Sequence, residues 1–158
     1  MKTTRLCYNK VNKYYLFIKE SKMIKIIYGS KGSGKTKKIL DMANDALAST
    51  KGDVVFLATT TRYRMEIKPQ IRFIDTVEEG ISTKDALIGF IKGLLCGNYD
   101  IEYVFIDGFY KMMGVELDSP EVAEFFMALE GLSQNTNFVL TVSCDLDKMP
   151  ACIAKYVK

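Results

Sequence analysis

Five short runs of apolar and β-branched residues alternate along this chain with segments whose apolar residues recur at helical spacing. The runs are residues 23–28, 53–59, 71–75, 101–107 and 137–143. Runs of this length are typical of buried strands, and helices of about 12–15 residues between them typically connect parallel strands. The alternation therefore predicts one α/β domain over residues 23–158. We expect a mainly parallel sheet of about five strands, sandwiched by helices.

The segments between these runs carry recognisable helix signals. Ser119 and Pro120 offer an N-cap and a proline in the first helical position, and residues 82–85 resemble a capping box. Arg72 interrupts the third apolar run, which suggests an edge strand. Helices are expected over residues 36–49, from 82–85 to about 97–98, over 119–132 and, as a short closing helix, over 147–156.

Composition excludes several classes of protein. The chain of 158 residues contains no histidine, so Ser-His-Asp and Cys-His hydrolases, HExxH metalloproteases and Cys2His2 zinc fingers cannot be built from it. Its four cysteines form no CxxC pair, so a thiolate metal site is not expected. A reduced, cytoplasmic compartment fits these cysteines best, and Cys96 is expected as a small core residue on a helix.

Positive charge is concentrated at the start of the chain. Residues 1–22 hold six basic side chains and one acidic side chain, whereas residues 23–158 hold 16 basic and 18 acidic ones. The body of the protein is therefore not expected to bind nucleic acid. Residues 1–22 have three interpretations: a leader upstream of a start at Met23, a short strand or helix packed on the domain, or a peripheral anchor or partner-binding arm. No apolar run approaches the roughly 18–20 residues that cross a bilayer.

A glycine-rich segment links the first expected strand to the first expected helix. It satisfies the pattern GxxxxGK[ST]. Its glycines let the backbone curl until successive N–H groups point at one anion, and the positive end of the following helix dipole adds to the attraction. Lys35 would set its ammonium between the β- and γ-phosphates, and Thr36 would give its hydroxyl to Mg²⁺. The predicted nucleotide phosphate site is Gly29, Ser30, Lys31, Gly32, Ser33, Gly34, Lys35 and Thr36.

With this loop the chain resembles the P-loop NTPases, and the resemblance covers essentially all of residues 23–158. Proteins of that family carry a second motif, a hydrophobic strand ending in an aspartate that holds Mg²⁺ through water. Residues 103–107, Tyr-Val-Phe-Ile-Asp, match this motif. The resemblance therefore implies that Thr36 and Asp107 hold the metal, and that ATP and Mg²⁺ are the ligands.

The subclass implied by the resemblance is the RecA-like, or ASCE, group. There, the strand that follows the aspartate strand lies between it and the P-loop strand, so Ser143 would face the γ-phosphate as a polar sensor. The strand order of kinases and GTPases is the alternative. Guanine specificity is not expected, because no NKxD follows the strands and residues 107–110 do not read DxxG.

The chain is also similar to short stand-alone P-loop proteins of Firmicutes, some of which carry ATP-binding or twitching-motility-ATPase names. Nucleotide binding alone is expected to transfer from them. Secretion and pilus-retraction ATPases have an additional N-terminal domain and histidine-containing motifs, and this chain has no histidine.

The groups needed for turnover are less well marked. Hydrolysis needs a group that orients or deprotonates water, commonly a glutamate beside the metal-binding aspartate, but glycine follows Asp107. Glu78 and Glu79, after the third strand, are the candidates that could join Lys35 and Asp107 in a catalytic set. Arg62 and Arg64 follow the second strand, where ligand crevices of open α/β sheets lie. One of these arginines is expected to contact phosphate or a second substrate.

Three functions follow from these expectations. The first is an ATP-binding, Mg²⁺-dependent ATPase or nucleotide-driven switch. The second is a small-molecule, nucleoside-like kinase that uses residues 59–64 for its acceptor, and the third is a nucleotide-binding regulator without turnover. Whether the chain forms a homo-oligomer or binds another protein stays open.

Overall fold

The structure, a computed structural model, describes residues 24–157. The interpretations given for residues 1–22 lie outside this range. The strands are β1 (Ile24–Gly29), β2 (Asp53–Ala58), β3 (Arg72–Asp75), β4 (Ile101–Ile106) and β5 (Asn137–Ser143). The α-helices are α2 (Lys35–Ser49), α3 (Lys84–Gly97), α4 (Phe109–Met112), α5 (Pro120–Leu132) and α6 (Ala151–Ala154). Two 3₁₀ helices, η1 (Thr61–Glu66) and η2 (Leu146–Lys148), complete the described elements.

All five strands form one parallel sheet in the order β1-β5-β4-β2-β3. This confirms the predicted α/β class and the expectation that the fifth strand lies between the first and the fourth. It also confirms that the third strand, which contains Arg72, is at an edge. Because the strands are parallel, their carboxyl ends meet at one side of the sheet, and the loops that follow them gather there.

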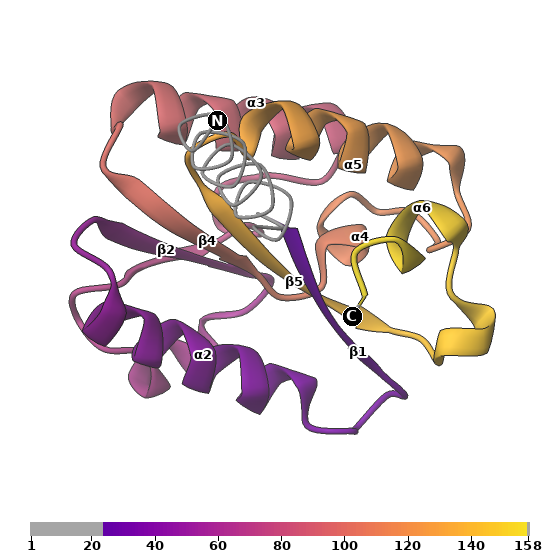
Figure 1. The fold of residues 1–158 in the computed structure, drawn as a ribbon, viewed down its shortest axis with the longest axis horizontal. Coiled ribbons are helices and arrows are strands. Elements are labelled where there is room, and N and C mark those ends of the chain that lie inside the picture. Colours follow the sequence, from indigo (N-terminus) through magenta and orange to yellow (C-terminus); the bar gives the residue numbers. More distant parts are fainter. Residues whose placement is uncertain (1–23, 158) are drawn as a thin grey trace, which may run out of the picture.

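Helices cover both faces of the sheet (Figure 1). Helix α2 packs on one face, where Ile39 and Ala43 meet Phe56 and Phe105. Helices α3 and α5 cover the other face together with the short α4 and α6. Successive strand residues point to opposite faces, so Val104 and Ile106 of β4 belong to the α3–α5 side. By the same alternation, residue 107 projects on the α2 side.

The closing helix expected over residues 147–156 is not continuous. Two short pieces, η2 and α6, take its place, and Met149 and Pro150 separate them. Met149 is extended, with φ −74° and ψ 130°, because the ring of a proline disfavours helical geometry in the residue before it. Pro150 was expected early in this helix, but it stands before α6 as the N-cap residue.

Cys96, expected in the core, is exposed on α3. The buried residues of this helix are Leu87 and Ile91. Cys96 comes five residues after Ile91 and so lies about 140° round the helix from the buried face. Among residues 24–157, no helix has the length and apolar character needed to cross a membrane.

Candidate functional site

A cavity of about 470 Å³ opens at the carboxyl ends of the strands. This volume falls in the range of small-molecule sites, about 300–1,000 Å³. The loop after β1, the start of α2, the end of β2, strand β5 and the segments after β2 and β4 line it. They are Lys31, Gly32, Gly34, Lys35, Thr36, Ala58, Thr59, Thr60, Tyr63, Asp107, Gly108, Tyr110, Lys111, Thr141 and Ser143.

The glycine-rich loop, residues 29–36, takes a conformation that depends on its glycines. Gly29, Gly32 and Gly34 have φ angles of 152°, 82° and 83°, in the region that favours glycine over residues with a side chain. A Cβ added to Gly29 would lie 2.6 Å from Ser33 Oγ, so this position also requires close approach. Helix α2 begins at Lys35, within the last two residues of this loop, so the helix N-terminus with its unpaired amides lies at the cavity lining.

Lys35 folds back over the loop. Its Nζ donates a hydrogen bond of 2.7 Å to the Ser30 carbonyl oxygen and a longer one of 3.4 Å to Ser33 Oγ. Partial burial lowers the pKa of Lys35, and the like charge of Lys111 acts in the same direction, whereas Asp107 opposes the shift. The ammonium therefore lies in a partly desolvated position, where an anion would restore favourable interactions for its charged form.

Thr36 and Asp107 meet inside the cavity. Thr36 Oγ1 donates a hydrogen bond of 3.1 Å to Asp107 Oδ2. The other carboxylate oxygen, Oδ1, accepts a hydrogen bond of 2.6 Å from Thr141 Oγ1. Thr141 Oγ1 in turn accepts the Gly108 amide at 2.9 Å. One carboxylate is thus held between two hydroxyl groups that come from α2 and β5.

Several lining residues were not singled out from the sequence as site residues. Thr141 could have been found as the polar residue inside the otherwise apolar stretch 138–142. Lys111 lies on α4, a helix of four residues that is too short to show a periodic pattern of apolar residues. Its side chain passes near Gly108. Tyr63 and Tyr110 follow β2 and β4. Among the described residues that line the cavity, Lys31, Lys35 and Lys111 outnumber the one carboxylate, Asp107, so the cavity favours an anion.

The predicted arginines lie beside this cavity rather than in its lining. Arg62 and Arg64 belong to η1, and both side chains are exposed. The Arg62 guanidinium carbon lies 5.8 Å from the centre of the Tyr63 ring, and that of Arg64 lies 5.4 Å from the centre of the Phe73 ring. Their phosphate-binding role stays a prediction. Thr59, Thr60 and Tyr63, from the same segment, do line the cavity.

Glu78 and Glu79 are exposed in the loop after β3. Strand β2 separates β3 from β4, and two strand spacings amount to about 10 Å. The structure does not bring these carboxylates into the cavity lining together with Asp107. Asp75, just before them, uses its Oδ1 to accept the Val77 amide at 2.9 Å, so the start of this loop is a local turn.

The chemistry of the cavity fits a nucleotide with Mg²⁺. Mg²⁺ takes one or two protein oxygens together with phosphate oxygens and water, and Thr36 with Asp107 supplies such a pair. In the described part of the chain, no group of three or more His, Cys, Asp or Glu side chains could hold a metal ion alone.

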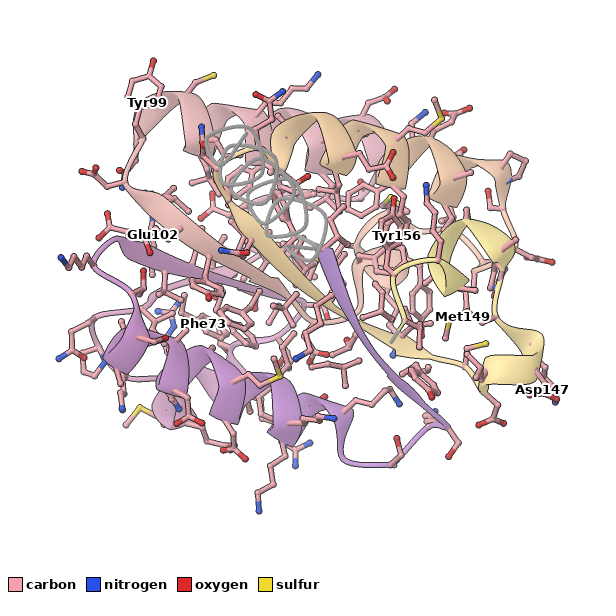
Figure 2. The ribbon with its side chains drawn as sticks, viewed as in Figure 1. Phe73, Tyr99, Glu102, Asp147, Met149 and Tyr156 are labelled. Atoms are coloured by element: carbon pink, nitrogen blue, oxygen red, sulfur yellow. The ribbon has the colours of Figure 1, made fainter. Side chains whose placement is uncertain are left out.

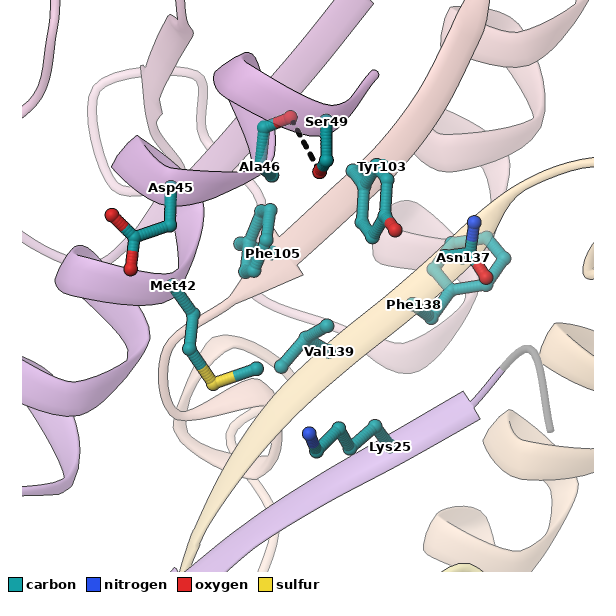
Figure 3. A pocket seen from close by; sticks show the side chains of 10 residues that line it. All are labelled: Lys25, Met42, Asp45, Ala46, Ser49, Tyr103, Phe105, Asn137, Phe138 and Val139. Carbon is teal, nitrogen blue, oxygen red and sulfur yellow. Dashed lines mark hydrogen bonds between the residues drawn. The ribbon is translucent and has the colours of Figure 1, made fainter. Parts of the chain in front are cut away.

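A second cavity, of about 360 Å³, lies between the second half of α2 and the amino-terminal parts of β1, β4 and β5 (Figure 3). Met42 from α2 and the rings of Tyr103 and Phe105 from β4 form much of its wall. Lys25 of β1 and Asp45 of α2 bring opposite charges to its rim. Neither the glycine-rich loop nor Asp107 contributes to its lining, so it is separate from the candidate site.

Comparisons with known proteins add no assignment. Neither a scan of protein-family models nor a search of curated proteins finds a match to this chain.

Proposed function

We propose that this chain is a P-loop protein that binds ATP with Mg²⁺ and works as a nucleotide-driven switch or slow ATPase. The observation that carries the proposal is the contact of 3.1 Å between Thr36 and Asp107, beside a loop whose glycines adopt positive φ. The glycine-rich loop would hold the phosphates through its amides and Lys35. Thr36 and Asp107 would hold Mg²⁺, which supplies charge neutralisation at the phosphates when bound.

The cavity supports slow turnover better than fast hydrolysis. Among the described residues that line the cavity, Asp107 is the one carboxylate, and in the proposed site it serves as a ligand of Mg²⁺. A general base needs a free acceptor within reach of the attacking water. Once Asp107 is committed to Mg²⁺, the described part of the lining offers no second carboxylate for this role, so slow water activation is expected and the bound triphosphate should persist.

A small acceptor is the second candidate for the same cavity. Thr59, Thr60 and Tyr63, from the segment after β2, also line the cavity, and their hydroxyls could bind a neutral polar molecule. A kinase would form ADP only when such an acceptor is added, whereas an ATPase or switch would release phosphate without one. A regulator without turnover would do neither.

Thermal unfolding with and without nucleotide tests the proposal. Mg-ATP at about 100 times its dissociation constant stabilises a protein by roughly 2.7 kcal/mol, which for this size is a rise in Tm of about 5–11 °C. Lys35→Ala should remove most of this rise. Lys25→Ala is the matched control and should keep the rise in Tm, because Lys25 lies on β1 and lines the second cavity. A rise that persists in Lys35→Ala would contradict the proposed site.

A further inference from the structure

Thr141 is a buried polar residue within an apolar strand. It is 3% exposed, and its neighbours Leu140 and Val142 are fully buried. A hydroxyl at such a position costs stability unless it is hydrogen-bonded. The chain could avoid that cost with valine, which has nearly the same shape, so the hydroxyl needs an explanation.

The register of the sheet places Thr141 beside Asp107. Ile106 of β4 pairs with Leu140 of β5, so the next residue of each strand stands side by side. Both residues project on the α2 face by strand alternation. The short bond of 2.6 Å between Thr141 Oγ1 and Asp107 Oδ1 lies in the range of hydroxyl–carboxylate hydrogen bonds, about 2.5–2.7 Å.

The Gly108 amide fixes the direction of the Thr141 hydroxyl. It donates to Thr141 Oγ1 at 2.9 Å, which uses one lone pair of that oxygen. The single hydroxyl proton is given to Asp107 Oδ1. This leaves Asp107 Oδ2 turned toward Thr36, its partner at 3.1 Å.

We propose that Thr141 is a positioning residue for the metal, which orients the Asp107 carboxylate so that Thr36 and Asp107 Oδ2 together present oxygens to Mg²⁺. This inference rests on the proposed function, because it assumes a metal bound with nucleotide in this cavity. Thr141 does not touch the metal itself. It acts through Asp107, and outer partners of this kind typically change metal affinity by about 10–100-fold when removed.

A purely structural role makes a different prediction. If Thr141 only satisfied the Gly108 amide, its loss would lower Tm and leave the dependence of nucleotide binding on Mg²⁺ unchanged. If Thr141 instead positions Asp107, its loss should affect the binding of Mg²⁺ and leave the binding of metal-free nucleotide intact. The affinity for nucleotide without metal depends on the glycine-rich loop and should survive, whereas the Mg²⁺ concentration needed for tight binding should rise.

The experiment titrates Mg²⁺ into the full chain with a saturating non-hydrolysable ATP analogue, and separately measures the affinity for the analogue in EDTA. Thr141→Val should raise the Mg²⁺ concentration at half-maximal stabilisation at least tenfold and leave the EDTA affinity within about twofold. Thr141→Ser keeps the hydroxyl and should behave as the wild type. If the valine variant does not fold, Thr141→Cys, a weak donor, replaces it with the same expected shift.

The outcomes separate this inference from the proposed function. An unchanged Mg²⁺ dependence in the valine or cysteine variant overturns the positioning role while nucleotide binding stands. An equal loss of affinity in EDTA also overturns it, because the defect would then lie in the glycine-rich loop. A wild-type chain that binds no analogue at all overturns the proposed function itself.

Discussion

Thr36 Oγ1 donates a hydrogen bond of 3.1 Å to Asp107 Oδ2 across 71 residues of sequence. The bond joins the first turn of α2 to the residue that follows β4. It also joins the two sequence patterns, the GxxxxGK[ST] loop and the apolar strand ending in aspartate, that are far apart along the chain. The fold therefore brings both patterns into one cavity.

Replacing Thr36 by valine should separate metal-dependent from metal-independent nucleotide binding. Thr36→Val removes a hydroxyl that bonds Asp107 and would contact Mg²⁺, so the rise in Tm with ATP should no longer depend on Mg²⁺. Without ligand, urea unfolding should show a loss of about 0.5–1.5 kcal/mol from the missing hydrogen bond. Thr36→Ser is the control and should retain the Mg²⁺ dependence. A valine variant with full Mg²⁺ dependence would place the metal elsewhere.

Two glycine-to-alanine substitutions should have opposite effects. Gly29→Ala places a Cβ 2.6 Å from Ser33 Oγ at a φ of 152°, and such strain costs about 1–3 kcal/mol. Gly89 lies inside α3 with nothing within 4 Å of an added Cβ, so Gly89→Ala should raise the free energy of unfolding by about 0.5–1 kcal/mol. Nucleotide affinity should fall in the first variant alone. Equal effects of the two would show that the loop geometry is not required.

Lys111 and Arg64 form a second matched pair. Lys111 lines the cavity and its charge lowers the pKa of Lys35, so its ammonium is close enough to attract a polyphosphate. Arg64 instead lies over the Phe73 ring, with its guanidinium carbon 5.4 Å from the ring centre. Lys111→Ala should weaken ATP binding several-fold in a calorimetric titration, whereas Arg64→Ala should leave it unchanged and cost about 0.5–1 kcal/mol of stability. The reverse pattern would instead support the predicted contact of Arg64 with phosphate.

The sequence predicted the parts of the site that depend on local pattern. The glycine-rich loop and the apolar strand before Asp107 are contiguous, and their residue types follow from local backbone geometry and strand burial. The strand order was also expected, but only through a family resemblance, since apolar runs alone do not say which strands pair.

Other parts of the site depend on tertiary placement. The cavity partners Thr141 and Lys111 come from different elements, and only the pairing of β4 with β5 and the turn at Gly108 bring them to Asp107. Glu78 could be named from the sequence as an acid after a strand, but its distance from the cavity depends on β2 lying in between. Which residues come close to Asp107 is therefore decided by the order of the strands in the sheet, and no short segment of sequence reveals it.

Tyr156 follows α6 (Figure 2). Its ring stacks on that of Phe126 in α5, with the ring centres 5.2 Å apart. Its hydroxyl donates a hydrogen bond to Glu130 Oε1. Burial, with this hydrogen bond as a second cause, raises the pKa of Tyr156 from 10.0 to about 12. The neutral phenol is therefore favoured in the folded state, and its contribution to stability is complete below pH 10.

Tyr156→Phe tests this linkage by its dependence on pH. As pH rises from 10 to 12, the unfolded tyrosine ionises before the folded one, so the wild type should lose up to about 2–3 kcal/mol of stability through this residue. The phenylalanine variant lacks the titrating group. It should be less stable at pH 8 by about 0.5–1.5 kcal/mol, the cost of the lost hydrogen bond, and should approach or exceed the wild type near pH 12. Most lysines titrate alike in both proteins, so the difference between two urea-unfolding series reports the phenol together with Lys155, whose pKa the Tyr156 hydroxyl helps to raise. Parallel curves from pH 8 to 12 would show that Tyr156 ionises with an ordinary pKa, and hence that the packing of the chain end on α5 does not exclude water from its hydroxyl.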